Sequence, residues 1–366
     1  MKNDARSDKI VSLLWMEHEK KFQELVECAF SCEKEGRPEY FSKLSKRVQK
    51  IIYRDTKYNV DFLYTAFVLD DEKIMENYAR WLFRFMASVF EGKRTLSETA
   101  DYVIEHFEYI CQGIRKTIDE EKQPRLLELL DCAKKSVDRA RDKENVTEPV
   151  WRASDYEKEI DQYMQALLKK DSRRASYLIQ QFNEAGIPTQ DIYAGILAES
   201  MRRVGELWHT AKISVDEEHY CTSVTQMAMA QMYPNILLSE RKDKTLLCAC
   251  PGTELHEMGA RMVADIFEND GWDSIYLGAA VPEDAMLSAI RENQPDLIVL
   301  SVTMPPHLLM CRELVGAIKE EFPDCKIAVG GNAFRATEHL WSQWPIDAHT
   351  EDARELLAWA NGEIEV

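Results

Sequence analysis

Four short apolar runs decide the fold of the last third of this chain: TLLCAC (245–250), DSIYLG (273–278), DLIVLSV (296–302) and KIAVGG (326–331). The stretches between them have the amphipathic pattern of helices: HEMGARMVADIFEND (256–270), PEDAMLSAIREN (282–293) and PHLLMCRELVGAIKEEF (306–322). Continuous apolar strands that alternate with amphipathic helices are typical of a parallel sheet covered by helices on both faces. We therefore predict a doubly wound α/β domain over residues 243–366.

Residues 154–240, which precede this domain, have a helical pattern throughout. Their segments are YEKEIDQYMQALLKKD (156–171), Ser172–Phe182, DIYAGILAESMRRVGELWH (191–209) and an apolar stripe that ends near Tyr233. Ser154 and Thr189 are placed to cap the first and third of these helices. Four helices with short connections predict a small bundle.

The first part of the chain, residues 1–145, also has helical periodicity, with apolar positions three and four apart. The periodic segments are 62–69, 75–89, 96–114 and 126–140. The segment RDKENVTEPVWRAS (141–154) interrupts the pattern with a proline, and we interpret it as a linker. The predicted class is therefore an all-α N-terminal domain, a four-helix bundle and an α/β domain.

Composition excludes several classes of protein. The 366 residues carry 46 Lys and Arg against 64 Asp and Glu, a formal charge of -18, which argues against nucleic-acid binding through a general basic surface. No apolar run approaches the roughly 20 residues that span a bilayer. The polar start, MKNDARSDKIVSLLWMEHEK, is not a signal peptide, and the nine cysteines show no CxxC spacing. We expect a soluble cytoplasmic protein with reduced thiols and no membrane partner.

The residues with distinctive chemistry follow the predicted strands. After the first strand Glu254, His256 and Gly259 are spaced E-x-H-x-x-G; Ser301 and Thr303 follow the third strand, and a pair of glycines, 330 and 331, follows the fourth. Parallel α/β sheets bind ligands at the carboxyl ends of their strands. A loop histidine with a carboxylate two residues away suits a metal ligand, because the carboxylate can hold the second ring nitrogen.

These three loops together resemble the cobalamin-binding fold, whose signature is D-x-H-x-x-G, then S-x-L or S-x-T, then G-G. The resemblance implies a Rossmann-like, flavodoxin-like domain in which His256 is the lower cobalt ligand in place of dimethylbenzimidazole. Ser301, Thr303, Gly330 and Gly331 would line the slot for the displaced nucleotide tail. Glu254 departs from the usual Asp by one methylene. The alternative is an ordinary flavodoxin-like receiver domain that carries a histidine by chance.

The bundle holds a second motif in LWHTAKISVDEEHY (207–220), where nine residues separate Trp208 from Glu218-His219. The spacing W-x9-E-H resembles the helical cap of the light-sensing adenosylcobalamin proteins of the CarH type. In that family the tryptophan and glutamate enclose the 5′-deoxyadenosyl group on the upper face of the corrin. The histidine that follows the tryptophan, here His209, can take the vacant cobalt position after photolysis. The resemblance covers residues 154–366.

Physical chemistry supports these roles independently. An indole above the corrin fills space and excludes a methyl acceptor, a carboxylate accepts hydrogen bonds from adenosine hydroxyls, and imidazole is a good ligand for Co(III). The alternatives are that Trp208 is a core aromatic residue of the bundle and that His209 is a solvated residue at a helix end. His219 could simply be the surface neighbour of Glu218.

The acidic N-terminal part lacks the winged helix-turn-helix of the CarH-type repressors, so we predict no direct DNA binding. It resembles the globin-like, bilin-binding domain that precedes the same cobalamin module in photocobilins. The resemblance implies biliverdin or another bilin as a second cofactor; dimerisation and partner docking are the alternatives. No residue here can be assigned to a bilin. We expect a homo-oligomer and an unidentified downstream protein partner.

Three functions remain open on the sequence. The first is a photoreceptor in which light breaks the cobalt–carbon bond of adenosylcobalamin and changes the packing of the bundle, and thus the oligomeric or partner state. The second is a corrinoid carrier for methyl transfer, whose upper face must stay open. The third is an adenosylcobalamin mutase subunit, which would need a partner to supply the substrate barrel. We expect a sensor or binding protein rather than a catalyst.

Overall fold

The computed structural model describes residues 20–142, 146–237 and 239–362. The chain divides into two compact units. The first runs up to Thr147 and includes Met304–Leu309 and Asn332–Leu340; the second holds the rest. The predicted bundle and sheet thus fall in one unit. The domain limits that we placed at 145, 154, 240 and 243 remain predictions.

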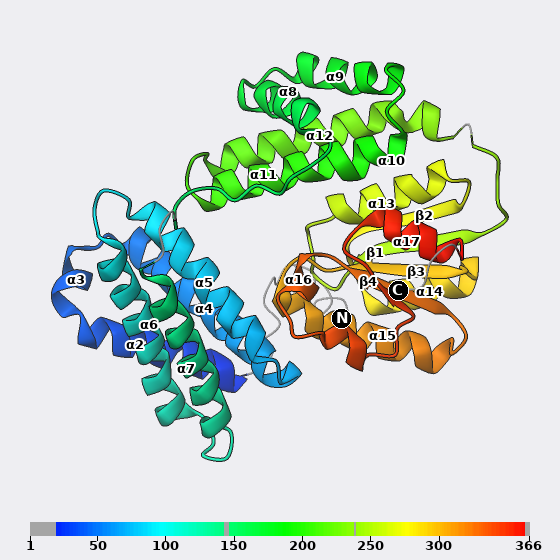
Figure 1. The fold of residues 1–366 in the computed structure, drawn as a ribbon. Helices are drawn as coiled ribbons and strands as arrows, with labels where there is room; N and C mark the ends of the chain where they lie inside the picture. Colours follow the sequence, from blue (N-terminus) through cyan, green and yellow to red (C-terminus); the bar gives the residue numbers. More distant parts are fainter. Residues whose placement is uncertain (1–19, 143–145, 238, 363–366) are drawn as a thin grey trace, which may run out of the picture. The chain divides into compact units, whose positions relative to one another are not determined.

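The N-terminal part consists of helices, as the periodicity predicted (Figure 1). They are α2 (Lys20–Gly36), α3 (Pro38–Lys43), α4 (Lys46–Leu69), α5 (Glu72–Val89), α6 (Leu96–Thr117) and α7 (Gln123–Ala140). Local capping explains their starts: the Ser45 hydroxyl accepts the N–H of Val48, and Thr95 and Glu98 form a capping box. The all-α class is confirmed, whereas the globin-like comparison remains a prediction.

A buried polar cluster links α2 to α6. Glu33 is fully buried, and its carboxylate contacts Arg37 Nη1 at 3.0 Å and His106 Nδ1 at 3.0 Å. The other ring nitrogen of His106 lies 3.1 Å from Asn59 Nδ2 on α4. Burial opposes ionisation of Glu33, but the hydrogen bond with His106 and the charges of His106 and Arg37 outweigh it. The pKa of this carboxyl is therefore lowered.

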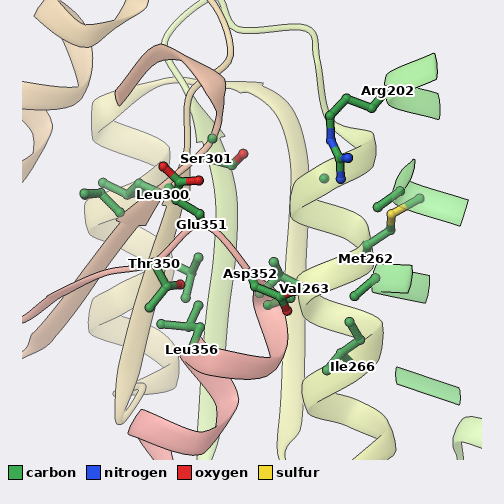
Figure 2. Close-up of a pocket in the computed structure, with 18 residues that line it drawn as sticks. Arg202, Met262, Val263, Ile266, Leu300, Ser301, Thr350, Glu351, Asp352 and Leu356 are labelled. Carbon is green, nitrogen blue, oxygen red and sulfur yellow. The ribbon is translucent and has the colours of Figure 1, made fainter. Parts of the chain in front are cut away.

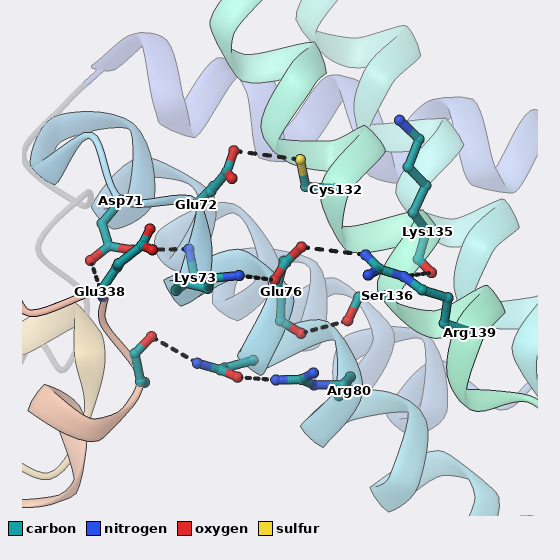
Figure 3. Close-up of polar contacts among 12 residues, drawn as sticks. Asp71, Glu72, Lys73, Glu76, Arg80, Cys132, Lys135, Ser136, Arg139 and Glu338 are labelled. Carbon is teal, nitrogen blue, oxygen red and sulfur yellow. Dashed lines mark hydrogen bonds and ion pairs between the residues drawn. The ribbon is translucent and has the colours of Figure 1, made fainter. Parts of the chain in front are cut away.

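A second set of polar contacts joins α5 to α7 (Figure 3). Glu76 on α5 pairs with Lys73 at 2.9 Å and with Arg139 at 3.4 Å, and its backbone carbonyl accepts the hydroxyl of Ser136. Asp71 caps α5 by accepting the N–H of Lys73 at 2.9 Å. The predicted helical packing is thus fixed by specific polar contacts as well as by its apolar faces.

The second unit begins with the predicted helical bundle. Its elements are α8 (Glu157–Leu168), α9 (Ser172–Glu184), α10 (Thr189–Asp191), the π-helical segment η2 (Ile192–Leu197), α11 (Ala198–His209) and α12 (Val215–Ile236). Two of the predicted caps were wrong. The N-cap of α8 is Tyr156 and not Ser154, and the N-cap of α10 is Pro188 and not Thr189. The Ser154 hydroxyl instead accepts the N–H of residue 156 in a turn before the helix.

The predicted parallel sheet is present and has one more strand than the sequence indicated. Its strands are β1 (Thr245–Pro251), β2 (Asp273–Val281), β3 (Leu297–Ser301), β4 (Lys326–Gly330) and β5 (Ala348–His349). All pairings are parallel, in the order β2-β1-β3-β4-β5. Each strand except β2 and β5 is almost entirely buried, which explains the continuous apolar runs.

Helices and short turns connect these strands. They are α13 (Met258–Asn269), α14 (Glu283–Asn293), η3 (Pro305–His307), α15 (Leu308–Glu321), α16 (Asn332–Arg335), η4 (Leu340–Gln343) and α17 (Ala353–Ala360). Helices α13 and α17 lie side by side (Figure 1). Strand β2 lies on one side of β1 and β3 on the other, so the strand order reverses between β1 and β3. The loops after β1 and β3 therefore meet at the point where α/β sheets bind ligands.

Within the described ranges, no helix is both long and apolar enough to cross a membrane.

Candidate corrinoid-binding site

The loop after β1 holds His256 in a defined orientation. Both the backbone N–H and ring Nδ1 of His256 contact Glu254 Oε1, at 2.9 and 2.6 Å. The carboxylate is fully buried, whereas 57% of the histidine side chain is exposed. Because Nδ1 is engaged by a carboxylate, the other ring nitrogen, Nε2, is the one available to a metal.

The longer side chain of Glu254 has a structural use. Its second oxygen, Oε2, accepts the backbone N–H of Thr303 at 2.8 Å, from the loop after β3. One carboxylate therefore ties together the loops after β1 and β3. The departure from the usual Asp does not prevent the histidine–carboxylate contact, and Thr303 enters the site through its backbone.

The pKa of His256 is raised by charges on its own loop and on the bundle. The hydrogen bond to Glu254 raises the pKa of His256; burial lowers it, and the charges of Glu254 and of Glu218 on α12 raise it further. Helix α12 also contacts the same loop directly, since Gln226 Nε2 donates to Glu257 Oε1 at 3.4 Å. The middle of α12 therefore contacts the loop that carries His256.

A cavity of about 190 Å³ lies beside this loop, between the bundle and the sheet (Figure 2). Three of the four predicted slot residues, Ser301, Gly330 and Gly331, line it together with Gly259, whereas Thr303 is not among its lining residues. Met262, Val263 and Ile266 of α13 form one wall, opposite Leu300 of β3 and Leu356 of α17. The structure thus brings the three predicted loops together around one cavity.

The glycines of this cavity are required for different reasons. Gly331 has a φ of +102°, and a Cβ there would lie 2.3 Å from the carbonyl oxygen of Val302. No other residue fits this backbone without a shift. At Gly259 the nearest atom to an added Cβ would be Ser301 Oγ, at 4.0 Å, so a side chain there would enter the cavity instead.

Sequence reasoning missed several residues that line the cavity. Those from the bundle are Ala194, Ala198 and Arg202; those after β5 are Thr350, Glu351 and Asp352 in the loop and Ala353, the first residue of α17. Strand β5 has only two residues, too few to show a period, so the loop after it was not recognised as a strand end. The polar run TED (350–352) ahead of the apolar helix ARELLAWA was the available signal.

The W-x9-E-H residues lie at the facing ends of α11 and α12. Trp208 and His209 are in the last turn of α11, and Glu218 and His219 are in the first turns of α12. The Glu218 carboxylate accepts the hydroxyl of Thr222 at 2.9 Å, and it contacts His219 Nδ1 at 2.8 Å. His219 itself is mostly exposed, so its surface position agrees with a neighbour of Glu218 rather than a ligand.

The burial of these residues bears on the alternatives. His209 is only 4% exposed, so the alternative of a solvated helix-end residue is wrong. Trp208 is half-buried.

The geometry defines a class of protein: a parallel sheet whose strand-end loops present a carboxylate-held histidine beside a narrow cavity, closed by a helical bundle. Residues 244–357 match a family model described as a B12 binding domain, and residues 159–233 match a second model with the same description. The helical part and the sheet part of this unit are thus each similar to a B12 binding domain.

Individual relatives agree with this similarity. The dimethylamine corrinoid protein 3 of Methanosarcina acetivorans is 24% identical over 179 residues, which are 48% of this chain and 83% of that protein. The monomethylamine corrinoid protein 1 of Methanosarcina mazei is 24% identical over 174 residues, 44% of this chain and 77% of that protein. The solved monomethylamine corrinoid protein of Methanosarcina barkeri is similar in fold, with a TM-score of 0.50, 20% identity, and coverage of 57% of this chain and all of that one.

The residues present fit a corrinoid. The exposed imidazole would supply one ligand to the cobalt, and the cavity, whose glycine wall a Cβ would fill, would suit a flat or narrow group. In the part of the chain that the structure describes, no three His, Cys, Asp or Glu side chains gather as a metal site.

Proposed function

We propose that this protein is an alkylcobalamin-binding light sensor. The observation that carries the proposal is the hydrogen bond of Gln226, on the same helix as Glu218, to Glu257 next to His256. A helix that carries part of the W-x9-E-H motif therefore packs beside the loop of the proposed lower ligand, which supports an enclosed upper face. When bound, adenosylcobalamin would supply a cobalt–carbon bond that visible light breaks.

Each residue has a role in this proposal. His256 would hold the cobalt through Nε2, and Glu254 would fix the ring. Glu218 would accept hydrogen bonds from the upper ligand, and Trp208 would cover it. His209 is buried, so it could become the upper ligand only if the last turn of α11 rearranged. Such a rearrangement would change the packing of the bundle and make the protein's size or partner state depend on the ligand.

A bilin in the N-terminal helices is a second part of the proposal. It is supported by stacked aromatic rings on α4 and α5. The ring centroids of Phe62 and Tyr78 are 3.8 Å apart, and those of Trp81 and Phe85 are 5.7 Å apart. Aromatic faces of this kind suit a flat conjugated ligand. The check is the absorption spectrum of the protein after incubation with biliverdin, and an unchanged biliverdin spectrum would contradict this part.

A corrinoid carrier for methyl transfer is the second candidate. The comparisons favour it over light sensing, because the matched relatives are named as dimethylamine and monomethylamine corrinoid proteins. Either way the chain is a binding protein rather than a catalyst in its own right, in agreement with those relatives. A carrier must leave the upper face open, so its methyl donor would have to reach the cobalt past Trp208 and Glu218.

One experiment separates the two candidates. The protein is loaded in the dark with adenosylcobalamin or methylcobalamin, and its affinity, absorption spectrum and elution volume are measured before and after green light. A sensor prefers adenosylcobalamin and changes its elution volume after illumination. A carrier prefers methylcobalamin and keeps its elution volume. Because light also breaks the bond in unbound alkylcobalamins, bleaching alone does not decide.

Variants connect the result to the residues. His256→Ala should lose most of the affinity for either corrinoid under both candidates. Trp208→Ala should weaken adenosylcobalamin binding selectively if the indole covers the adenosyl group. Equal weakening of both corrinoids by Trp208→Ala would contradict the sensor proposal.

A further inference from the structure

The segment between the two predicted helical parts is held against α11. Arg203, whose side chain is 7% exposed, donates to the carbonyl of Arg152 at 3.1 Å and to the carboxylate of Glu157 at 2.8 Å. The backbone N–H of Val150 donates to Glu206 Oε2 at 3.2 Å. Residues 150–157 therefore follow the position of α11, the helix that ends in the W-x9-E-H tryptophan.

Tyr156 in this segment packs on Gly195, a residue next to the cavity. A Cβ added at Gly195 would lie 2.8 Å from Cδ2 of the Tyr156 ring. Gly195 belongs to the π-helical segment Ile192–Leu197, whose neighbouring residue Ala194 lines the cavity. Short π-helical segments are often found at functional sites, because the extra residue changes the direction of the side chains that follow.

The hydroxyl of Tyr156 reaches the opposite side of the cavity through ion pairs. It donates to Asp191 Oδ2 at 3.0 Å, and the other oxygen of Asp191 pairs with Arg354 Nη1 at 2.8 Å. Arg354 Nη2 in turn contacts Asp352 Oδ2 at 2.6 Å, and Asp352 both caps α17 and lines the cavity. One linker tyrosine thus contacts Gly195, next to the lining residue Ala194, and is connected through this relay to the lining residue Asp352.

We infer that Tyr156 is a positioning residue for the cavity, and that filling the cavity with the nucleotide tail of a corrinoid orders residues 150–157. The inference rests on the proposed corrinoid site but not on light sensing. Its physical basis is that a ligand in the cavity restrains Ala194 and Asp352, and Tyr156 is connected to both through Gly195 and the ion-pair relay, so the linker has fewer arrangements when the cavity is full. The ion pairs of Arg354 with Asp191 and Asp352 are partly exposed and each is weak by itself. The relay and the contact with Gly195 nevertheless both involve Tyr156.

The first test is hydrogen–deuterium exchange of residues 150–157 in the full chain. It compares the free protein with protein saturated by methylcobalamin, which has a nucleotide tail, and by cobinamide, a corrinoid without one. We expect residues 150–157 to exchange more slowly with methylcobalamin bound than in the ligand-free protein. With cobinamide bound, we expect them to exchange at the rate of the ligand-free protein. Equal protection by both corrinoids, or none with methylcobalamin at saturation, would overturn the inference.

The second test removes the hydroxyl and keeps the ring. Tyr156→Phe should weaken methylcobalamin binding by about two- to fivefold, the range expected for one partly exposed hydrogen bond, and leave cobinamide binding unchanged. The matched control is Tyr177→Phe on α9, where the tyrosine is 52% exposed. Asp191→Asn, which breaks the same relay from the other side, should reproduce the effect if Tyr156→Phe lowers the yield of folded protein.

The outcomes distinguish this inference from the proposed function. If the wild-type protein binds neither corrinoid, the corrinoid site fails and this inference with it. If both corrinoids bind and Tyr156→Phe and Asp191→Asn affect them equally or not at all, only the positioning role fails.

Discussion

Replacing Glu254 by glutamine tests the core of the site. The carboxylate accepts three hydrogen bonds, from the backbone and ring of His256 at 2.9 and 2.6 Å and from the N–H of Thr303 at 2.8 Å. A glutamine has one oxygen and one NH2 group, so it cannot accept on both sides. The NH2 group of the glutamine must then face an N–H group of either Thr303 or His256, so that two donors oppose each other.

The structure gives the magnitude of the expected effect. In the better orientation, the amide oxygen faces His256 and one backbone N–H loses its acceptor, which costs about 1–3 kcal/mol. The bonds to His256 also lose their charge assistance, which roughly halves their strength. We therefore expect the free energy of unfolding of Glu254→Gln to fall by about 2 kcal/mol. We expect its affinity for methylcobalamin to fall by about 10- to 100-fold, as for other residues that orient a metal-bound histidine.

The assay is a titration of the protein with methylcobalamin in the dark, followed by absorption, together with urea unfolding of the ligand-free form. Glu257→Gln is the matched control, because it removes the same charge from the same loop and leaves Glu254 in place. Glu254→Asp should retain part of the affinity, since it keeps the charge for His256 but is too short to reach Thr303 as well. Wild-type affinity and spectrum in Glu254→Gln would refute the assigned role of the carboxylate.

Three further predictions follow from particular residues. Gly331→Ala should lower the free energy of unfolding by about 3 kcal/mol, because the added Cβ would collide with the Val302 carbonyl. The control is Gly316→Ala in α15, where the added Cβ has open space, so this variant should be neutral or more stable in the same urea titration. Equal unfolding midpoints for the two variants would contradict this prediction. His209→Ala should leave dark binding of adenosylcobalamin unchanged and alter the absorption spectrum after illumination; a change confined to the dark form would show that the upper-ligand role is wrong. The pKa of Glu33 is lowered by folding from its ordinary value of 4.5, so its stabilising effect is complete above that pH and is lost as the pH falls through the lowered value. The difference in unfolding free energy between wild type and Glu33→Gln should therefore shrink from about pH 7 to about pH 3, and a constant difference would count against the ionised pair.

The sequence predicted the elements of the fold well where the signal was local. The apolar runs gave four strands, and the helical periodicities gave α5, α6 and α7 close to their observed bounds. It did not predict β5, because a strand of two residues has no period. It also missed the π-helical segment Ile192–Leu197, since a single extra residue in a helix hardly alters the apolar pattern.

The candidate site was predicted only in part, for a related reason. His256 and Glu254 could be paired because they are two residues apart, and Ser301 and the glycine pair could be placed because each follows a strand. Arg202 and Asp352 could not, because no local pattern indicates that two residues 150 positions apart line the same cavity. The exposure of His209 was also beyond local reasoning, because it depends on what packs against the end of α11.

The amino-acid sequence by itself determined which segments form helices and which form strands, and which loops carry possible ligands or glycines. These features follow from the periodicity and spacing of side chains over a few neighbouring residues. The tertiary structure alone decided which loops meet. The order β2-β1-β3-β4-β5 brings the ends of β1, β3 and β4 to one edge, and the packing of α11 and α17 beside that edge closes the cavity. Contacts between distant segments depend on how the sheet is ordered and covered, and a single sequence does not record that order locally.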